Sequence, residues 1–206
     1  MALEPSDSSE SLNIDLSDID FEQIDREVKE FAEQTYGEYT SFHHALVEDL
    51  RDAAQVVKLT GTQFAKRTYL RTFFSFVEGV LFARQTVILR YVEFTPQSVP
   101  QRFDVAEQIL LREVEYELDD NGSVKIKEGR YPAFLRRVRF IFSMWAKHHG
   151  KACTVDYSGT GWEALREAQA IRNRITHPRR ESHLMISDIE MFKIKGALEW
   201  FLKALD

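Results

Sequence analysis

Three residues near the end of one predicted helix carry side chains that can act on a phosphate group. Arg172, Asn173 and His177 lie in the stretch RNRITHP, which ends at Pro178. A histidine changes charge near neutral pH and can serve as a general acid or base. An arginine offers a rigid fork of N–H donors that matches phosphate oxygens. The stretch is therefore a candidate catalytic centre, and the alternative is an ordinary polar helix end stopped by proline.

Further arginines surround this stretch. Residues 166–180 contain five arginines and one acidic residue, Glu167. Such a patch can gather phosphate groups. Cations at the C-terminal end of a helix also complement its dipole and cap its carbonyl groups, and His177 can be a capping residue of the same kind. Both interpretations stay open on the residues alone.

Helical geometry separates the arginine from the histidine. At about 100° per residue, Ala168, Ile171 and Ile175 share an apolar face, and Arg172 lies at its margin. His177 lies about 140° from Arg172 around the helix axis. The two side chains meet over one ligand only if the long arginine reaches round, or if the last turn loosens before Pro178.

A partly buried arginine needs an acidic partner. Glu78 lies in the middle of a phenylalanine-rich segment and has no basic residue three or four positions away. We predict an ion pair between Glu78 and Arg172, with Arg174 and Arg71 as alternative partners. Such a pair can also be purely structural and set the register of two helices.

Hydrophobic spacing predicts an all-α protein. Turn and capping signals divide the pattern: a break at Gly37, an LTGT turn (59–62) that supplies an N-capping threonine, and capping boxes at Thr160–Glu163 and Ser187–Glu190. Gly150 is expected to follow the end of a helix. The expected helical segments are residues 19–55, 63–93, 132–149, 161–177 and 191–205.

One segment between the helices predicts β-structure. VEYELDDNGSVKIK (114–127) alternates apolar and polar residues around an Asp-Asn-Gly turn, which is typical of a hairpin. The fold that we predict is a helical bundle with a small β-hairpin insertion. Its organisation is a disordered acidic N-terminus (1–17), an acidic helical arm (18–58) and a helical domain (59–206).

Composition and charge narrow the class of protein. The single cysteine, Cys153, excludes an internal disulfide and a cysteine-based zinc cluster and fits a reducing compartment. The net charge of −6 is unevenly distributed, because residues 1–52 carry 15 acids and only 3 bases. Residues 53–206 are therefore net positive, and the acidic overall charge does not exclude that they bind nucleic acid. Glu78 and Arg84 interrupt the most apolar stretch, which argues against a membrane span. We predict a cytoplasmic protein.

The pattern R-N-x-x-x-H at a helix end, inside a small all-α domain, resembles the HEPN superfamily. The signature of that superfamily is an arginine, four to six residues and a histidine; here Arg172 and His177 bracket four residues. Asn173 occupies the polar position often seen after the arginine, and Glu78 lies on a long apolar helix upstream. The resemblance covers roughly residues 60–206 and leaves the acidic N-terminal region outside.

The resemblance implies metal-independent RNA cleavage by a toxin or antiviral effector that acts as a homodimer, with two motif copies facing one cleft. It implies that Arg172 stabilises the charge on the phosphate in the transition state, that Asn173 orients the histidine or contacts the backbone, and that His177 acts as the general acid or base. It implies that Arg174, Arg179 and Arg180 bind RNA, and we expect Glu78 and Arg71 to support the site. No cofactor or metal is expected; the expected partners are RNA, a second copy and an antitoxin or regulatory protein.

One departure in the sequence, and the diversity of the family, limit what this resemblance implies. Family toxins that are silenced by a nucleotidyltransferase carry a tyrosine two residues after the histidine, where this chain has Arg179. Some family members are inactive binding modules, so the alternative function is a non-catalytic dimer that binds RNA, a nucleotide or a protein.

The other histidines do not indicate a metal site. The two side chains of each histidine pair, at 43–44 and 148–149, diverge by about 100° on a helix, so neither pair is a natural metal site.

Overall fold

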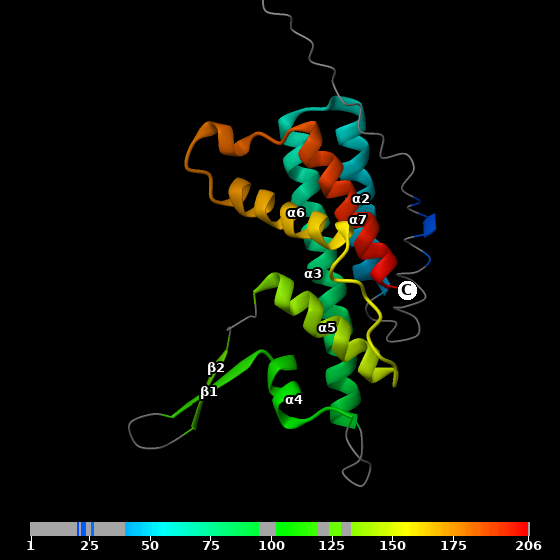
Figure 1. Ribbon diagram of the computed structural model, residues 1–206, viewed down its shortest axis with the longest axis vertical. Helices are drawn as coiled ribbons and strands as arrows, with labels where there is room; N and C mark the ends of the chain where they lie inside the picture. Colours follow the sequence, from blue (N-terminus) through cyan, green and yellow to red (C-terminus); the bar gives the residue numbers. More distant parts are fainter. Residues whose placement is uncertain are drawn as a thin grey trace, which may run out of the picture. The chain divides into compact units, whose positions relative to one another are not determined.

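A computed structural model describes residues 20, 22–23, 26, 40–94, 102–118, 124–128 and 133–205, and most of them are helical (Figure 1). The all-α class is therefore confirmed. The described residues fall into two compact units. The first unit contains residues 20, 22–23, 47–74 and 157–205, and the second contains residues 26, 40–46, 75–94, 102–118, 124–128 and 133–156. The predicted disordered N-terminus (1–17) lies outside the described residues.

In the first unit, the end of helix α2 (Thr40–Thr60) is joined to the start of helix α3 (Gln63–Phe94) by the predicted turn. Gly61 has a φ of 58°, a left-handed conformation that glycine adopts without strain. The Thr62 hydroxyl accepts a hydrogen bond from the Ala65 N–H at 3.2 Å, so this N-cap is confirmed. Residues 47–58, which end the predicted acidic arm, supply buried side chains to this unit, including Val47 and Leu50.

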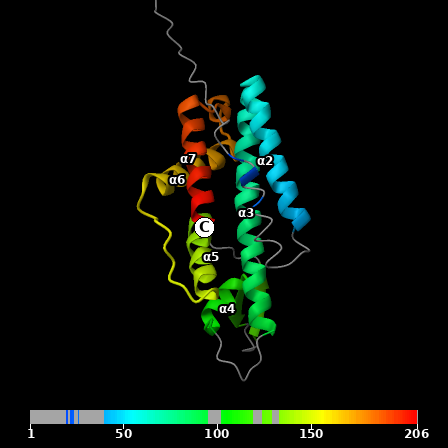
Figure 2. The same cartoon turned by 90° about the vertical axis from the view of Figure 1, so that its right-hand side faces the viewer.

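Helices α6 (Thr160–Thr176) and α7 (Asp188–Leu205) pack against each other in the first unit, and the short 3₁₀ helix η2 (Glu181–Leu184) connects them (Figures 1 and 2). The capping box at the start of α7 is confirmed, since Ser187 N–H donates to the Glu190 carboxylate at 2.9 Å and Glu190 N–H donates to Ser187 Oγ at 3.3 Å. The box predicted at Thr160 is wrong. The N-cap is Gly159, so the Thr160 hydroxyl lies already inside the first turn.

The second unit contains helix α4 (Val105–Leu111), strands β1 (Val114–Leu118) and β2 (Val124–Glu128), and helix α5 (Phe134–His148). The strands pair antiparallel, with Tyr116 opposite Ile126. The predicted Asp-Asn-Gly turn lies outside the described residues. Gly150, with a φ of 68°, follows α5 as expected.

Helix α4 was not expected from the hydrophobic spacing, because seven residues hold too few apolar positions to show a period. Its signal is a capping box. Glu107 N–H donates to Asp104 Oδ1 at 2.8 Å, and Asp104 N–H donates to Glu107 Oε2 at 2.9 Å.

Helix α3 is long and apolar enough to cross a membrane by length and composition. However, 67% of its most apolar window is buried inside the structure. Glu78 is half-buried, and Arg84 is only 3% exposed. A mostly buried core helix passes the same test of length and composition, so this helix is weak evidence for a membrane span.

A buried tyrosine in the first unit gives a test of the core. Tyr69 is 0% exposed, and its hydroxyl group has no hydrogen-bond partner among the described residues. Burial, aided by the charge of Glu199, raises the pKa of Tyr69, so the phenol stays neutral. Because an unpaired buried hydroxyl costs about 1–3 kcal/mol, we expect Tyr69→Phe to raise the free energy of unfolding by about 1 kcal/mol. Urea denaturation measures this change, and a loss of stability would mean that the hydroxyl group has a partner.

Candidate functional site

Helix α6 ends at the point that the sequence predicts. The last helical residue is Thr176, and His177 leaves the helix with φ −122° and ψ 61° while its N–H still donates to the Asn173 carbonyl at 3.1 Å. Pro178 follows and has no N–H with which to continue the helix. The Thr176 hydroxyl donates to the Arg172 carbonyl at 2.8 Å, so the last turn is held closed.

The three motif residues have different surroundings. Arg172 is half-buried, and its guanidinium carbon lies 5.6 Å from the centre of the Phe74 ring. Asn173 and His177 are exposed. The predicted position of Arg172 at the margin of the core is thus confirmed, and an accessible imidazole and amide lie beyond it at the same helix end.

Arg174 is engaged within the first unit. It forms an ion pair with Glu190 at 2.9 Å and donates to the Met185 carbonyl at 2.8 Å. Burial opposes ionisation of Glu190, but hydrogen bonds from Ser187 and Arg174 outweigh it and lower the pKa of this carboxyl below its ordinary value. Arg174 therefore ties the end of α6 to the start of α7, and two of its donors are already used.

Arg179 and Arg180 are exposed on the segment between α6 and α7. His183 Nδ1 lies 3.3 Å from the Arg179 backbone N–H, and its Nε2 lies 2.8 Å from Arg180 Nε. A neutral imidazole has only one acceptor nitrogen, so one of these hydrogen bonds forms at a time.

The supporting residues are divided between the two units. Arg71, which is exposed, belongs to the first unit with Arg172, whereas Glu78 belongs to the second. The Glu78–Arg172 ion pair stays a prediction, as does the alternative with Arg71. For Arg174 the structure shows a different acidic partner, Glu190, which sequence reasoning did not identify.

A cluster of aromatic and basic residues at the end of α5 was also missed. The His148 ring stacks on Trp145 at 5.6 Å between ring centres and meets the edge of Tyr91 at 5.0 Å. Arg102 donates a hydrogen bond to the His148 carbonyl. Burial, with smaller contributions from His149 and Arg102, lowers the pKa of His148 to about 4. His148 is therefore neutral at physiological pH and is a poor general acid.

The low pKa of His148 predicts acid sensitivity. The unfolded chain takes up this proton near pH 6.5, whereas the folded chain resists it until about pH 4, so stability is lost as the pH falls through this window. Because the ring is only partly buried, we expect the loss to be about 1 kcal/mol. Urea denaturation at the two ends of the window should show a smaller loss in His148→Phe than in the wild type. An equal loss in both would contradict the assignment.

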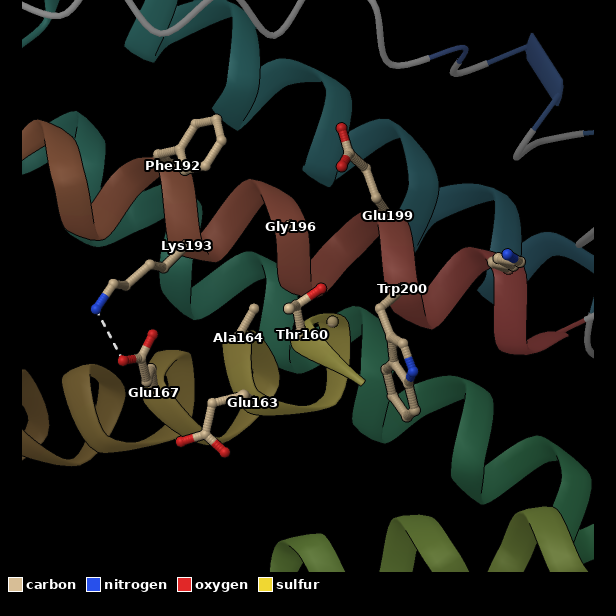
Figure 3. A pocket seen from close by; sticks show the side chains of 11 residues that line it. Thr160, Glu163, Ala164, Glu167, Phe192, Lys193, Gly196, Glu199 and Trp200 are labelled. Atoms are coloured by element: carbon tan, nitrogen blue, oxygen red, sulfur yellow. Dashed lines mark hydrogen bonds and ion pairs between the residues drawn. The ribbon is translucent and has the colours of Figure 1, made fainter. Parts of the chain in front are cut away.

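A groove of about 610 Å³ runs between α6 and α7 (Figure 3). An ion pair between Glu167 and Lys193 at 2.8 Å crosses it. No pattern in either helix alone reveals the groove, because it exists only once the two helices pack. Its lining residues are Thr160, Gly161, Glu163, Ala164, Glu167, Phe192, Lys193, Gly196, Glu199, Trp200 and Lys203.

Comparison of the chain with protein-family models, curated proteins and solved structures found no match. Within the described ranges, no group of three or more histidine, cysteine, aspartate or glutamate side chains could hold a metal ion. The fold and site thus define a helical protein with an arginine-rich helix end, where an arginine, an asparagine and a histidine lie within about one and a half turns.

Proposed function

We propose that this protein is a metal-independent endoribonuclease of HEPN type, acting in the cytoplasm as a toxin or antiviral effector. The observation that supports this proposal is the end of α6, where an exposed His177 follows a half-buried Arg172. Exposed Arg179 and Arg180 lie next to it and can bind the RNA backbone. The proposal includes an HEPN-like bundle in which β1 and β2 form an inserted hairpin, a homodimeric assembly and control by an antitoxin or regulatory protein.

The proposed reaction uses the ribose 2′-hydroxyl as nucleophile. His177 removes its proton, the 2′-oxygen attacks the adjacent phosphorus, and the bond to the 5′-oxygen of the next nucleotide breaks. Arg172 stabilises the charge that develops on the phosphate oxygens, and Asn173 orients the imidazole or contacts the backbone. The leaving oxygen takes up a proton, so the products are a 2′,3′-cyclic phosphate and a free 5′-hydroxyl end.

The direct test is incubation of purified protein with labelled RNA in the presence of EDTA, followed by analysis of the product ends. We expect cleavage that EDTA does not reduce and 2′,3′-cyclic phosphate ends. Intact RNA after incubation with folded protein, or cleavage that requires a divalent cation, would overturn the proposal.

The second candidate is a non-catalytic RNA-binding protein, with a nucleotide or protein ligand as a further alternative. It is favoured by the position of Arg172 over the Phe74 ring, since a guanidinium held there is directed towards the core and not towards a ligand. This function predicts RNA binding that weakens steeply with salt and survives His177→Ala, without new RNA ends. Filter binding at two salt concentrations separates it from the nuclease.

A further inference from the structure

The connection between α6 and α7 has an anchored half and an exposed half. In the anchored half, Gln63 exchanges two hydrogen bonds with the backbone of Ile186, at 3.0 and 2.7 Å. Arg67 donates to the Leu184 carbonyl at 2.9 Å. In the exposed half, every residue from 177 to 182 is exposed. The exposed half can therefore change its conformation while these contacts hold the start of α7 in place.

Ser182 provides a free hydroxyl group in the exposed half. This hydroxyl makes no hydrogen bond to a described residue. Ser182 lies in the four-residue helix η2, and the last hydrogen bond of this helix, from the Met185 N–H to the Ser182 carbonyl, is 3.4 Å long. That length exceeds the usual range of about 2.7–3.2 Å, and 3₁₀ hydrogen bonds have poor geometry. Little free energy is therefore needed to unwind η2 and present Ser182 on an extended chain.

The residues before Ser182 have the charge pattern of a kinase substrate. Arg179 and Arg180 precede the serine by three and two positions, and both are exposed. Serine kinases that recognise basic residues bind arginines at these positions through carboxylate groups. A guanidinium matches a carboxylate with two parallel hydrogen bonds, so each arginine contributes both affinity and register.

Two other hydroxyl groups of the same region lack this combination. Thr176 is exposed, but its hydroxyl donates to the Arg172 carbonyl at 2.8 Å within the last turn of α6. The Ser187 hydroxyl belongs to the capping box of α7, and no basic residue precedes it by two or three positions. Of these three residues, Ser182 alone combines exposure, a free hydroxyl group and two preceding arginines.

We propose that Ser182 is a phosphorylation site for a serine kinase that recognises basic residues. In this reaction the Ser182 oxygen attacks the γ-phosphorus of ATP, and the bond from that phosphorus to the oxygen that bridges it to the β-phosphorus breaks. ADP leaves, and the hydroxyl proton is released. The phosphoserine carries almost two negative charges at neutral pH and three strong acceptor oxygens.

Phosphorylation would reverse the charge of the exposed half. Residues 177–183 contain two arginines and one glutamate, a net charge of +1 with neutral histidines, and a phosphate changes this to about −1. In the unmodified chain, Arg180 Nε lies 2.8 Å from His183 Nε2. A charged phosphate is the stronger acceptor, so we expect it to bind the side chains of Arg179 and Arg180. Both arginines are then lost to RNA, a consequence that rests on the proposed function.

Phosphate transfer to the full chain tests the site. The purified chain is incubated with radiolabelled ATP and the catalytic subunit of cAMP-dependent protein kinase, and peptide mass spectrometry locates the phosphate. We expect incorporation at Ser182 that Ser182→Ala abolishes and Ser182→Thr retains. Arg180→Ala should lower the initial rate about tenfold, since one charge-assisted contact is lost. Arg166→Ala removes an arginine from the same region outside the recognised positions, so it is the matched control and should leave the rate unchanged.

RNA affinity is measured separately, by filter binding of a 2′-O-methyl oligonucleotide, which lacks the nucleophilic hydroxyl group and stays intact. Phosphorylation should raise the Kd about tenfold and lower the slope of log Kd against log salt by about 1.4, or about 0.7 for each lost phosphate contact. Absence of incorporation, or equal incorporation in Ser182→Ala, would overturn the site, and equal affinity of the two forms would overturn its effect on RNA. If the unmodified chain binds no RNA, the proposed function fails, while incorporation alone decides whether Ser182 is the site.

Discussion

His177→Ala should lower the rate of RNA cleavage at least about 100-fold, because a general base contributes about 10²–10⁴-fold to catalysis. The side chain is exposed at the helix end and only its backbone N–H bonds to α6, so we expect the free energy of unfolding to stay within about 0.5 kcal/mol. Single-turnover cleavage of a labelled RNA, with urea denaturation of the same preparation, measures both quantities.

Arg172 supplies the matched pair of variants for this prediction. Arg172→Lys keeps the positive charge but loses the planar fork, and Arg172→Ala loses both, so cleavage should fall further in the second variant. Both variants should also lose about 1 kcal/mol of stability, since the guanidinium packs on Phe74. If His177→Ala cleaves RNA at the wild-type rate, His177 is not the general base.

Gly161→Ala should lower the free energy of unfolding by about 3 kcal/mol. A Cβ atom at Gly161 would lie 2.6 Å from both Cβ and Cδ1 of Trp200 and 2.8 Å from its Cγ. These atoms are close to the α7 backbone, so the helix itself must move. The Trp200 ring is also confined by Trp162 and Tyr157, at 5.1 and 6.2 Å between ring centres. Thermal unfolding should show a melting temperature lower by about 10 °C.

Gly196→Ala is the control on the facing helix. A Cβ atom there would lie 3.7 Å from the Ala164 Cβ, which is an ordinary contact, and alanine is the better helix former. At a protein concentration too low for association, its stability should equal or exceed that of the wild type. A similar loss in both variants would show that the two helices do not approach as described.

The helices were predictable where a long segment carries a strong period or a paired capping signal. The segment from Gln63 to Phe94 is an example of a strong period, and the Ser187–Glu190 box is an example of a paired capping signal. The start of α6 was misjudged by one residue because Thr160 has the spacing of a capping residue but lies inside the helix. Local pattern alone does not distinguish the two positions.

The candidate site was predictable only in part. The placement of Arg172 at the core margin and of His177 outside it follows from the helical period of one segment. The ion pair between Arg174 and Glu190 does not, because a loop and η2 separate the two residues and no periodicity fixes their register. The groove likewise depends on the angle at which α6 and α7 pack, and sequence spacing does not specify that angle.

The three tryptophans are divided between the two units. Trp162 and Trp200 lie in the first unit, while Trp145 lies in the second and stacks on His148. Intrinsic tryptophan fluorescence therefore has a separate contribution from each unit. A Trp145→Phe variant removes the contribution of the second unit, so its emission reports on the first unit alone. Protonated imidazole quenches indole emission, so Trp145 would also report acidification within its own unit. The chain thus carries built-in probes of whether its two units unfold in one cooperative transition or in two.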